Sequence, residues 1–339
     1  MTDSNPSPVP REGYRPEWLA LEDASGGRYQ MVGDFNVDCP TYNAIFSMMS
    51  KQWPQLDDEL DISNEKTDES CNNTDVRIYR PKAIPVTPLP LMIFYHGGGY
   101  IAGTLDTEDA HCRYFAAKTP CLVISVNYEK VVEPGVNLDK IINQYGVPSV
   151  PWCRNRGTEL GADPSSTILC GGSAGAFLCA QVAYHYMERG GASPVTGLVL
   201  LFAVAFPYDY GENGKYKEKY TAWTENGFAQ VPVINRKLAE IIWSRYEADF
   251  NSPKHFPGLA DNLSEWPPTY IVAAEKDCFR DDGRLLDELL RQSGVPSKLE
   301  YYEGLPHYFH VFPALAVAHE MMANSVEGVR FILSHQGSR

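Results

Sequence analysis

The sequence has no run of about 18 apolar residues, the length that a membrane-spanning helix needs. Its first residues, 1–6, contain neither the basic region nor the apolar stretch of a secretion signal. We therefore expect no membrane span and a cytoplasmic location.

Cysteine is present but never in the C-x-x-C spacing of zinc ribbons and thioredoxin-type redox sites. Thiols inside the cell stay reduced, so we expect Cys170 and Cys179 to be small, buried, apolar side chains. We predict no metal and no cofactor.

Positive charge is scarce, because 29 Lys and Arg stand against 43 Asp and Glu and give a net charge of −14. Nucleic acid and an anionic membrane surface would both repel such a chain, so we exclude both as partners. The apolar share of 44% is ordinary for a soluble enzyme, and 339 residues are enough to bury a large core.

Apolar strand-like runs and helical stretches alternate over residues 75–335. Such alternation is typical of a mostly parallel sheet covered by helices on both faces, so we predict an α/β fold for this core. The predicted strands are 76–79, 91–95, 121–126, 167–170, 198–204, 270–274 and 299–302, and the main predicted helices are 108–118, 138–145, 281–293 and 314–334.

Two segments lie outside this pattern. Residues 1–60 hold a Pro-rich tail and an amphipathic region at 42–49, and the polar, acidic stretch 61–69 reads as a connection to the core. Residues 208–250 are rich in Tyr and Trp, from Tyr208 through Phe228 to Tyr246, and read as a helical insertion between two strands. Ligands of open parallel sheets bind at the carboxyl ends of the strands, where such an insertion would form a lid.

The run 167–170 ends in the pattern Gly-x-Ser-x-Gly, made by Gly171, Ser173 and Gly175, and a helical stretch follows. A strand, sharp turn and helix in this order form a nucleophile elbow, which lifts the serine oxygen above the sheet. A side chain at either glycine would crowd the neighbouring strand or the start of the helix. Ser173 is therefore a candidate nucleophile, and the alternative is an ordinary Gly-rich loop.

A second motif, His96-Gly97-Gly98-Gly99, directly follows the strand 91–95. Consecutive glycines leave backbone N–H groups free to converge on the oxyanion of a tetrahedral intermediate. Alone the motif could be a flexible turn, but the elbow downstream favours an oxyanion loop. We expect His96 to shape this loop rather than to carry a proton.

A serine hydroxyl is a weak nucleophile and needs a histidine base within hydrogen-bond reach. His307 stands in a loop just past the strand 299–302 and is the favoured base. The alternative is His310, three residues later, which we expect to be structural.

The acid that orients this histidine is expected after the strand 270–274. Asp277 is favoured, and Glu275, Asp281 and Asp282 compete by residue type. Asp281 and Asp282 are better placed at the start of the next helix, where carboxylates accept from free N–H groups. Serine, aspartate and histidine then follow in the order of the α/β-hydrolase triad.

From about residue 76 to 312 the chain resembles the α/β-hydrolase fold, and more narrowly the hormone-sensitive-lipase-like carboxylesterases. The stretches 96–103, 263–272 and 304–307 are similar to that family's oxyanion motif, its approach to the acid and its histidine loop. The resemblance implies a helical cap built from residues 1–60 and part of 208–250. It also implies a catalytic set of Ser173 as nucleophile, Asp277 as acid, His307 as base, and the N–H groups of Gly98, Gly99 and Ala174 as oxyanion donors.

The chain departs from this family at three places. Gly172 stands where members usually carry an acidic residue, and Ala176 stands where they usually carry Gly. The loop 128–134 differs from the usual Tyr-Arg-Leu-Ala-Pro-Glu, so substrate preference does not carry over from typical members. Among subgroups, the chain is similar to fungal secondary-metabolism esterases that resemble versiconal hemiacetal acetate esterase.

These features predict a cofactor-free serine hydrolase that cleaves carboxylic esters of small or medium apolar substrates through an acyl-enzyme. The expected partner is a small-molecule ester or a biosynthetic intermediate, and a homodimer is compatible with the sequence. The alternative is a tailoring enzyme that performs acyl transfer, polyketide release, or a non-hydrolytic cyclisation or elimination. A binding protein or receptor on this scaffold is disfavoured, because a binder has no need of a complete triad.

Overall fold

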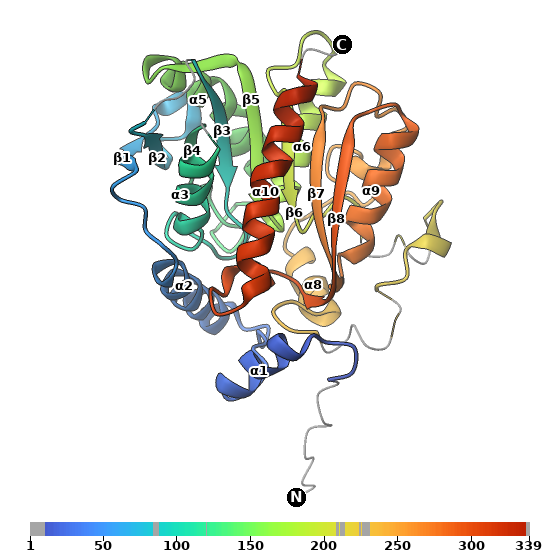
Figure 1. Ribbon diagram of the computed structural model, residues 1–339. Coiled ribbons are helices and arrows are strands. Elements are labelled where there is room, and N and C mark those ends of the chain that lie inside the picture. Colours follow the sequence, from blue (N-terminus) through green and yellow to red (C-terminus); the bar gives the residue numbers. More distant parts are fainter. Residues whose placement is uncertain are drawn as a thin grey trace, which may run out of the picture.

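A mostly parallel sheet forms the middle layer of the computed structural model, and helices cover both of its faces (Figure 1). The structure describes residues 11–83, 88–119, 121–207, 210, 214–223, 225 and 231–336. The strands are β1 (Leu60–Lys66), β2 (Asp75–Pro81), β3 (Leu89–Tyr95), β4 (Leu122–Val126), β5 (Ala162–Gly172), β6 (Gly197–Leu201), β7 (Thr269–Lys276) and β8 (Ser297–Pro306). The predicted α/β architecture is confirmed.

The strand order is β1-β2-β4-β3-β5-β6-β7-β8. β2 runs antiparallel to both β1 and β4, and every pairing from β4 to β8 is parallel. The central strands are buried on both faces, which explains their continuous apolar runs.

The helices divide between the two faces of the sheet. In Figure 1, α3 and α10 lie in front of it and contact each other, and α5 and α6 lie behind it. The helices are α1 (Pro16–Ala24), α2 (Phe35–Gln52), α3 (Asp109–Lys118), α4 (Leu138–Lys140), α5 (Val147–Glu159), α6 (Ala174–Glu188), α8 (Arg236–Trp243), α9 (Arg280–Gln292) and α10 (Ala316–His335).

Two regions of the sequence were harder to interpret. The prediction of a connection over 61–69 is wrong, because Leu60–Lys66 forms the edge strand β1. An edge strand pairs with a neighbour on one side only, and many of its side chains face solvent. Its sequence is therefore polar and lacks the apolar run by which a strand is usually predicted.

The helix predicted at 138–145 is longer in the structure. It continues through a π-helical turn, Ile141–Gly146, into α5, although α5 contains Pro148 and Pro151.

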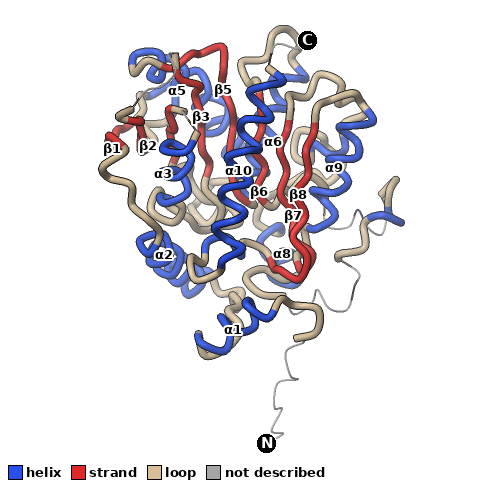
Figure 2. Tube along the Cα trace, in the orientation of Figure 1, coloured by secondary structure: helices blue, strands red, loops and turns tan. Residues whose placement is uncertain are grey.

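The N-terminal segment packs against the core through α2. The Asn43 side chain accepts a 2.7 Å hydrogen bond from the Gly103 N–H, and Ser50 Oγ accepts one of 2.9 Å from the Ala110 N–H in the first turn of α3. Trp53 donates its indole N–H to the Val311 carbonyl at 3.3 Å. Figure 2 shows that α1, α2 and α8 gather at the same end of the sheet.

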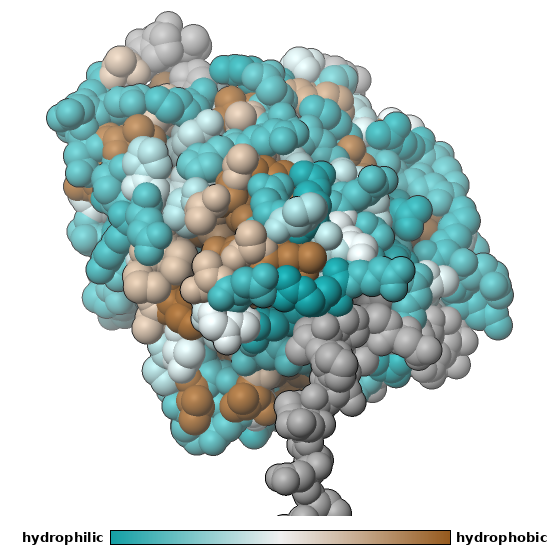
Figure 3. Space-filling model, turned by 60° about the horizontal axis from the view of Figure 1, so that its bottom comes forward, coloured by the Kyte–Doolittle hydropathy of each residue, from teal (hydrophilic) through white to brown (hydrophobic). Residues whose placement is uncertain are grey.

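Hydrophilic residues cover most of the face seen in Figure 3, and apolar residues form a band across its middle. Val37 and Met48 of α2 are each 51% exposed. In the described part of the chain, no helix is long and apolar enough to cross a membrane. The 8 cysteines are free thiols, and Cys170 and Cys179 are fully buried as expected.

We expect Ser50→Ala to lower the free energy of unfolding by about 1 kcal/mol, because the buried Ala110 N–H would lose its acceptor. Ser47→Ala, one turn earlier on the same helix, is the matched control, since both changes bring the same gain in helix propensity. Urea denaturation of both variants measures the difference. Equal stability of the two variants would show that this hydrogen bond does not hold α2 to α3.

Candidate active site

The site is built around the junction between β5 and α6. Ser173 is the single residue between them, and its backbone has φ 51° and ψ −115°, a strained conformation for a residue with a side chain. Its N–H donates to the Leu201 carbonyl at the end of β6 at 2.8 Å, and its carbonyl accepts from Phe177 N–H in the helix at 2.8 Å. These two hydrogen bonds fix the serine above the sheet.

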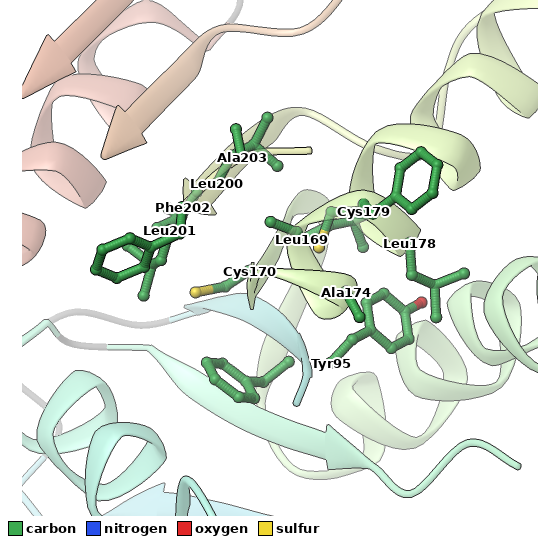
Figure 4. Packing of buried hydrophobic residues seen from close by; sticks show 14 of the residues in the cluster. Tyr95, Leu169, Cys170, Ala174, Leu178, Cys179, Leu200, Leu201, Phe202 and Ala203 are labelled. Atoms are coloured by element: carbon green, nitrogen blue, oxygen red, sulfur yellow. The ribbon is translucent and has the colours of Figure 1, made fainter. Parts of the chain in front are cut away.

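The first turn of α6 approaches the end of β3 very closely. A Cβ on Gly175 would overlap the Tyr95 carbonyl oxygen, so only glycine fits there. The following side chains of α6 pack into the apolar interior beside β5 and β6, where Leu178 and Cys179 lie among Tyr95, Leu169 and Leu200 (Figure 4). The sheet core therefore determines where the serine oxygen lies.

The structure brings Ser173, His307 and Asp277 together in one hydrogen-bonded chain. His307 Nε2 lies 2.8 Å from Ser173 Oγ, and His307 Nδ1 lies 2.6 Å from Asp277 Oδ2. All three side chains are buried, with exposed fractions of 6%, 3% and 1% in that order. The other Asp277 oxygen accepts from the Phe279 N–H at 2.9 Å, which orients the carboxylate toward the imidazole.

The three competing acids have other partners. Glu275 accepts from the Gly304 N–H at 2.7 Å. Asp281 accepts from two backbone N–H groups of the 208–250 segment and pairs with Arg280; burial opposes its ionisation, but the ion pair outweighs burial and lowers its pKa. Asp282 accepts from the Ala205 and Phe206 N–H groups and from the Tyr220 hydroxyl, and burial raises its pKa to about 8. None of these three faces the imidazole.

The alternative base, His310, does not reach the serine in this arrangement. It lies in a short 3-10 helix, Phe309–Val311, and its ring stacks on His111 with centroids 4.5 Å apart. It is fully buried, and burial lowers its pKa well below the ordinary value, which keeps the ring neutral.

The glycines after β3 face the same cavity as the serine. Gly98 has φ 115° and Gly99 has φ 62°, so the chain turns there in a way that favours glycine. Within the described residues, the N–H groups of Gly98 and Gly99 have no hydrogen-bond acceptor. They are thus available to an oxyanion beside Ser173, as is the helix N-terminus at Ala174.

The loop 128–134, which departs from the family pattern, contacts the Gly-rich loop 96–99 through Tyr128. The Tyr128 hydroxyl donates to the His96 carbonyl, and its ring stacks on the His96 ring with centroids 4.3 Å apart. His96 is fully buried, and burial lowers its pKa well below the ordinary value. The histidine therefore stays neutral and shapes the loop, as its sequence context predicts.

Two narrow, mostly apolar cavities meet at Ser173 and Gly99. The first, with about 310 Å³ of free volume, is also lined by His307, Tyr308 and the N-terminal residues Met31 and Tyr42. The second, with about 270 Å³, reaches Trp243 and Phe279. Among the described residues that line them, none is Asp, Glu, Lys or Arg.

Comparison with known proteins shows which family the chain belongs to. A model of a family described as alpha/beta hydrolase fold matches residues 92–311. The versiconal hemiacetal acetate esterase of Dothistroma septosporum is 30% identical over 328 residues, which cover 95% of each chain. The chain belongs to the α/β-hydrolase family.

Further similar proteins are also named as esterases. Carboxylesterase NlhH of Mycobacterium tuberculosis is 30% identical to this hydrolase over 277 residues, 78% of this chain and 82% of that protein. The solved structure of a bacterial heroin esterase superposes with a TM-score of 0.81 at 24% identity, covering 95% of this chain and 99% of that one. The resemblance to hormone-sensitive-lipase-like carboxylesterases is confirmed, and this hydrolase is an ester-hydrolysing enzyme.

One buried group of side chains in the described part of the hydrolase has the composition of a metal site. Ligand atoms of Glu108, His111 and His310 lie within 4.8 Å of one another. Both ring nitrogens of each histidine lack hydrogen-bond partners. A metal-bound histidine almost always donates from its other nitrogen to a neighbour that orients the ring, so this group lacks the surroundings of a metal centre.

Two residues beside the active site, Glu108 and Tyr308, were not predicted from the sequence. Glu108 reads as an ordinary residue at the start of a helix, and Tyr308 reads as one more aromatic residue after the histidine. Their hydrogen bond, with 3.1 Å between the Tyr308 hydroxyl and Glu108 Oε2, spans 200 positions of the chain. The unusual glycine at 172 was the available signal, because it leaves room for a neighbouring side chain.

We expect Gly175→Ala to lower the free energy of unfolding by about 3 kcal/mol and to reduce kcat, because a methyl group overlapping the Tyr95 carbonyl must push α6 and Ser173 away from β3. Gly157→Ala in α5 is the control, since its Cβ would meet only side-chain carbons of Leu91 and Ala162 at 3.3 Å and beyond. Thermal denaturation and steady-state ester hydrolysis measure both effects. Wild-type stability of Gly175→Ala would contradict this account of the elbow.

Proposed function

We propose that this hydrolase cleaves carboxylic esters of small or medium apolar substrates with Ser173 as nucleophile, His307 as base and Asp277 as orienting acid. The observation that carries the proposal is the pair of short contacts on the imidazole, 2.8 Å to the serine oxygen and 2.6 Å to the carboxylate. A nucleophile, a base and an orienting acid in one buried chain are the parts that acyl transfer needs.

In the first half of the reaction, Ser173 Oγ attacks the ester carbonyl as His307 Nε2 takes its proton. The N–H groups of Gly98, Gly99 and Ala174 stabilise the tetrahedral oxyanion, and Asp277 stabilises the imidazolium. His307 then gives the proton to the leaving alcohol, and the acyl group stays on Ser173. In the second half, a water molecule attacks the acyl-enzyme by the same route and releases the acid.

The lining of the two cavities supports the substrate class. Both are mostly apolar and lack charged carboxylate, ammonium or guanidinium groups among their described residues. An uncharged acyl chain in one cavity and an uncharged alcohol in the other would be desolvated at little cost, whereas a charged group would be left without a partner. Cavities of about 310 and 270 Å³ have room for acyl and alcohol groups of small or medium size.

We also propose that residues 1–60 and 208–250 form the cap over a core of residues 75–335. Met31 and Tyr42 come from the first segment and Ile242, Trp243 and Tyr246 from the second, and all five line the cavities at the serine. Tyr208 and Phe228, which the sequence placed in the insertion, lie outside the described residues.

Replacing the nucleophile tests the proposal directly. Ser173→Ala is expected to lower kcat for p-nitrophenyl butyrate by at least about 10³-fold, because no other group can form the acyl-enzyme. Ser334→Ala, at an exposed serine of α10, should keep full activity. A fluorophosphonate probe should label the wild type but not Ser173→Ala. Unchanged hydrolysis by Ser173→Ala would disprove the mechanism, and products of acyl transfer or cyclisation in place of free acid would favour the alternative chemistry.

The orienting acid has its own test. Asp277→Asn is expected to lower kcat by about 10³–10⁴-fold, because an amide favours the wrong tautomer of His307 and cannot stabilise the imidazolium. Glu275→Gln is the control, because its amide oxygen can still accept from the Gly304 N–H. Comparable activity of the two variants would assign the acid to another residue.

A further inference from the structure

The residue after the proposed base occupies an unusual position. Tyr308 has φ 60°, a left-handed conformation that a tyrosine rarely adopts. This backbone turns the side chain back beneath the active site, where it is 1% exposed and its ring stacks on that of His307 with centroids 5.1 Å apart. Burial raises the pKa of the hydroxyl well above its ordinary value, so the group stays a hydrogen-bond donor.

The Tyr308 hydroxyl donates to a carboxylate that also holds the oxyanion loop. Glu108 Oε2 accepts from this hydroxyl at 3.1 Å and from the Gly97 N–H at 2.6 Å, and the carboxylate is 2% exposed. Gly97 immediately precedes Gly98 and Gly99, the proposed oxyanion donors. One buried carboxylate oxygen thus joins the histidine loop to the oxyanion loop.

The same hydroxyl explains the glycine before the nucleophile. A Cβ on Gly172 would overlap the Tyr308 hydroxyl oxygen and lie 2.8 Å from the ring carbon that bears it. A Cβ on Gly97 would overlap the same oxygen. The tyrosine hydroxyl therefore fills the space between the strand before Ser173 and the Gly-rich loop. The acidic residue usual at position 172 in this family would have to displace this hydroxyl.

We propose that Tyr308 is a positioning residue for ester hydrolysis. Through its hydrogen bond to Glu108, it fixes the position of the Gly97–Gly99 backbone relative to His307. The proposal rests on the proposed function, because it assigns the oxyanion to the Gly98 and Gly99 N–H groups. Oxyanion donors must meet the oxygen of the transition state at hydrogen-bond distance, so a small displacement of the loop weakens transition-state binding more than substrate binding.

The first test is Tyr308→Phe, which keeps the ring and removes the hydroxyl. We expect kcat for p-nitrophenyl butyrate to fall about tenfold with KM within about twofold, because Glu108 loses one of the two hydrogen bonds that connect it to the histidine loop and the Gly-rich loop. Affinity for an alkyl trifluoromethyl ketone, which forms a tetrahedral adduct on the serine, should fall by a similar factor. The control is Tyr79→Phe, because the Tyr79 hydroxyl also donates to a buried carboxylate, Asp109 at 2.7 Å, and neither residue lines the cavities at Ser173.

The second test is a double-mutant cycle between positions 172 and 308. Gly172→Ala should lower kcat by tenfold or more in the wild type, where the methyl group meets the hydroxyl. In a Tyr308→Gly background, which suits the left-handed backbone, the same change should cost less than twofold, because the space is open.

The outcomes separate this proposal from the proposed function. If Ser173→Ala destroys activity but Tyr308→Phe matches Tyr79→Phe in kcat and in ketone affinity, the triad stands and the positioning role is wrong. An equal effect of Gly172→Ala in both backgrounds would also overturn the role. If Ser173→Ala is fully active, the proposed function itself fails. Thermal denaturation of each variant shows whether a loss of kcat comes from unfolding.

Discussion

The abrupt change from strand to helix at Ser173 is the constraint on which the rest of the site depends. One residue in a strained conformation joins β5 to α6, at a cost on the order of 1–3 kcal/mol. The cost is tolerated because both elements are held independently, β5 between β3 and β6 in the sheet and α6 by the apolar face that it buries. Gly175 in the first turn of α6 completes the arrangement, since it lets the helix touch the end of β3.

Buried acidic side chains around this junction differ in role because they differ in partners. Glu108, Asp277 and Asp282 are all nearly inaccessible to water, and each has at least two hydrogen-bond donors. Asp282 receives only protein donors that attach the 208–250 segment and the loop after β6. Asp277 receives one backbone N–H and leaves its second oxygen to an imidazole that also reaches the serine. Position, rather than residue type, separates a structural acid from the proposed catalytic one.

Much of this arrangement could be predicted from the sequence. Strands buried on both faces, such as β3 and β4, appear as unbroken apolar runs, and Ser173 and Asp277 each follow a buried run, whereas His307 follows the partly exposed strand β8. Local patterns fail where the determining neighbour is distant. Strand β1 is polar because it lies at an edge, and the Tyr308–Glu108 contact joins residues 200 positions apart. Residues 1–60 and 208–250 also line the cavities at Ser173, but their sequences show no periodic pattern that would predict this contact.

The wide separation of the site residues also has a consequence for the order in which the molecule is made. Met31 lines the cavity near the start of the chain, the elbow lies midway, and His307 follows the last strand. During synthesis on the ribosome, Ser173 emerges from the exit tunnel well before His307, so in the proposed mechanism a partly made chain holds the serine without its base. Under the proposed mechanism, ester cleavage therefore begins only after β8 has joined the sheet and placed His307 beside Ser173.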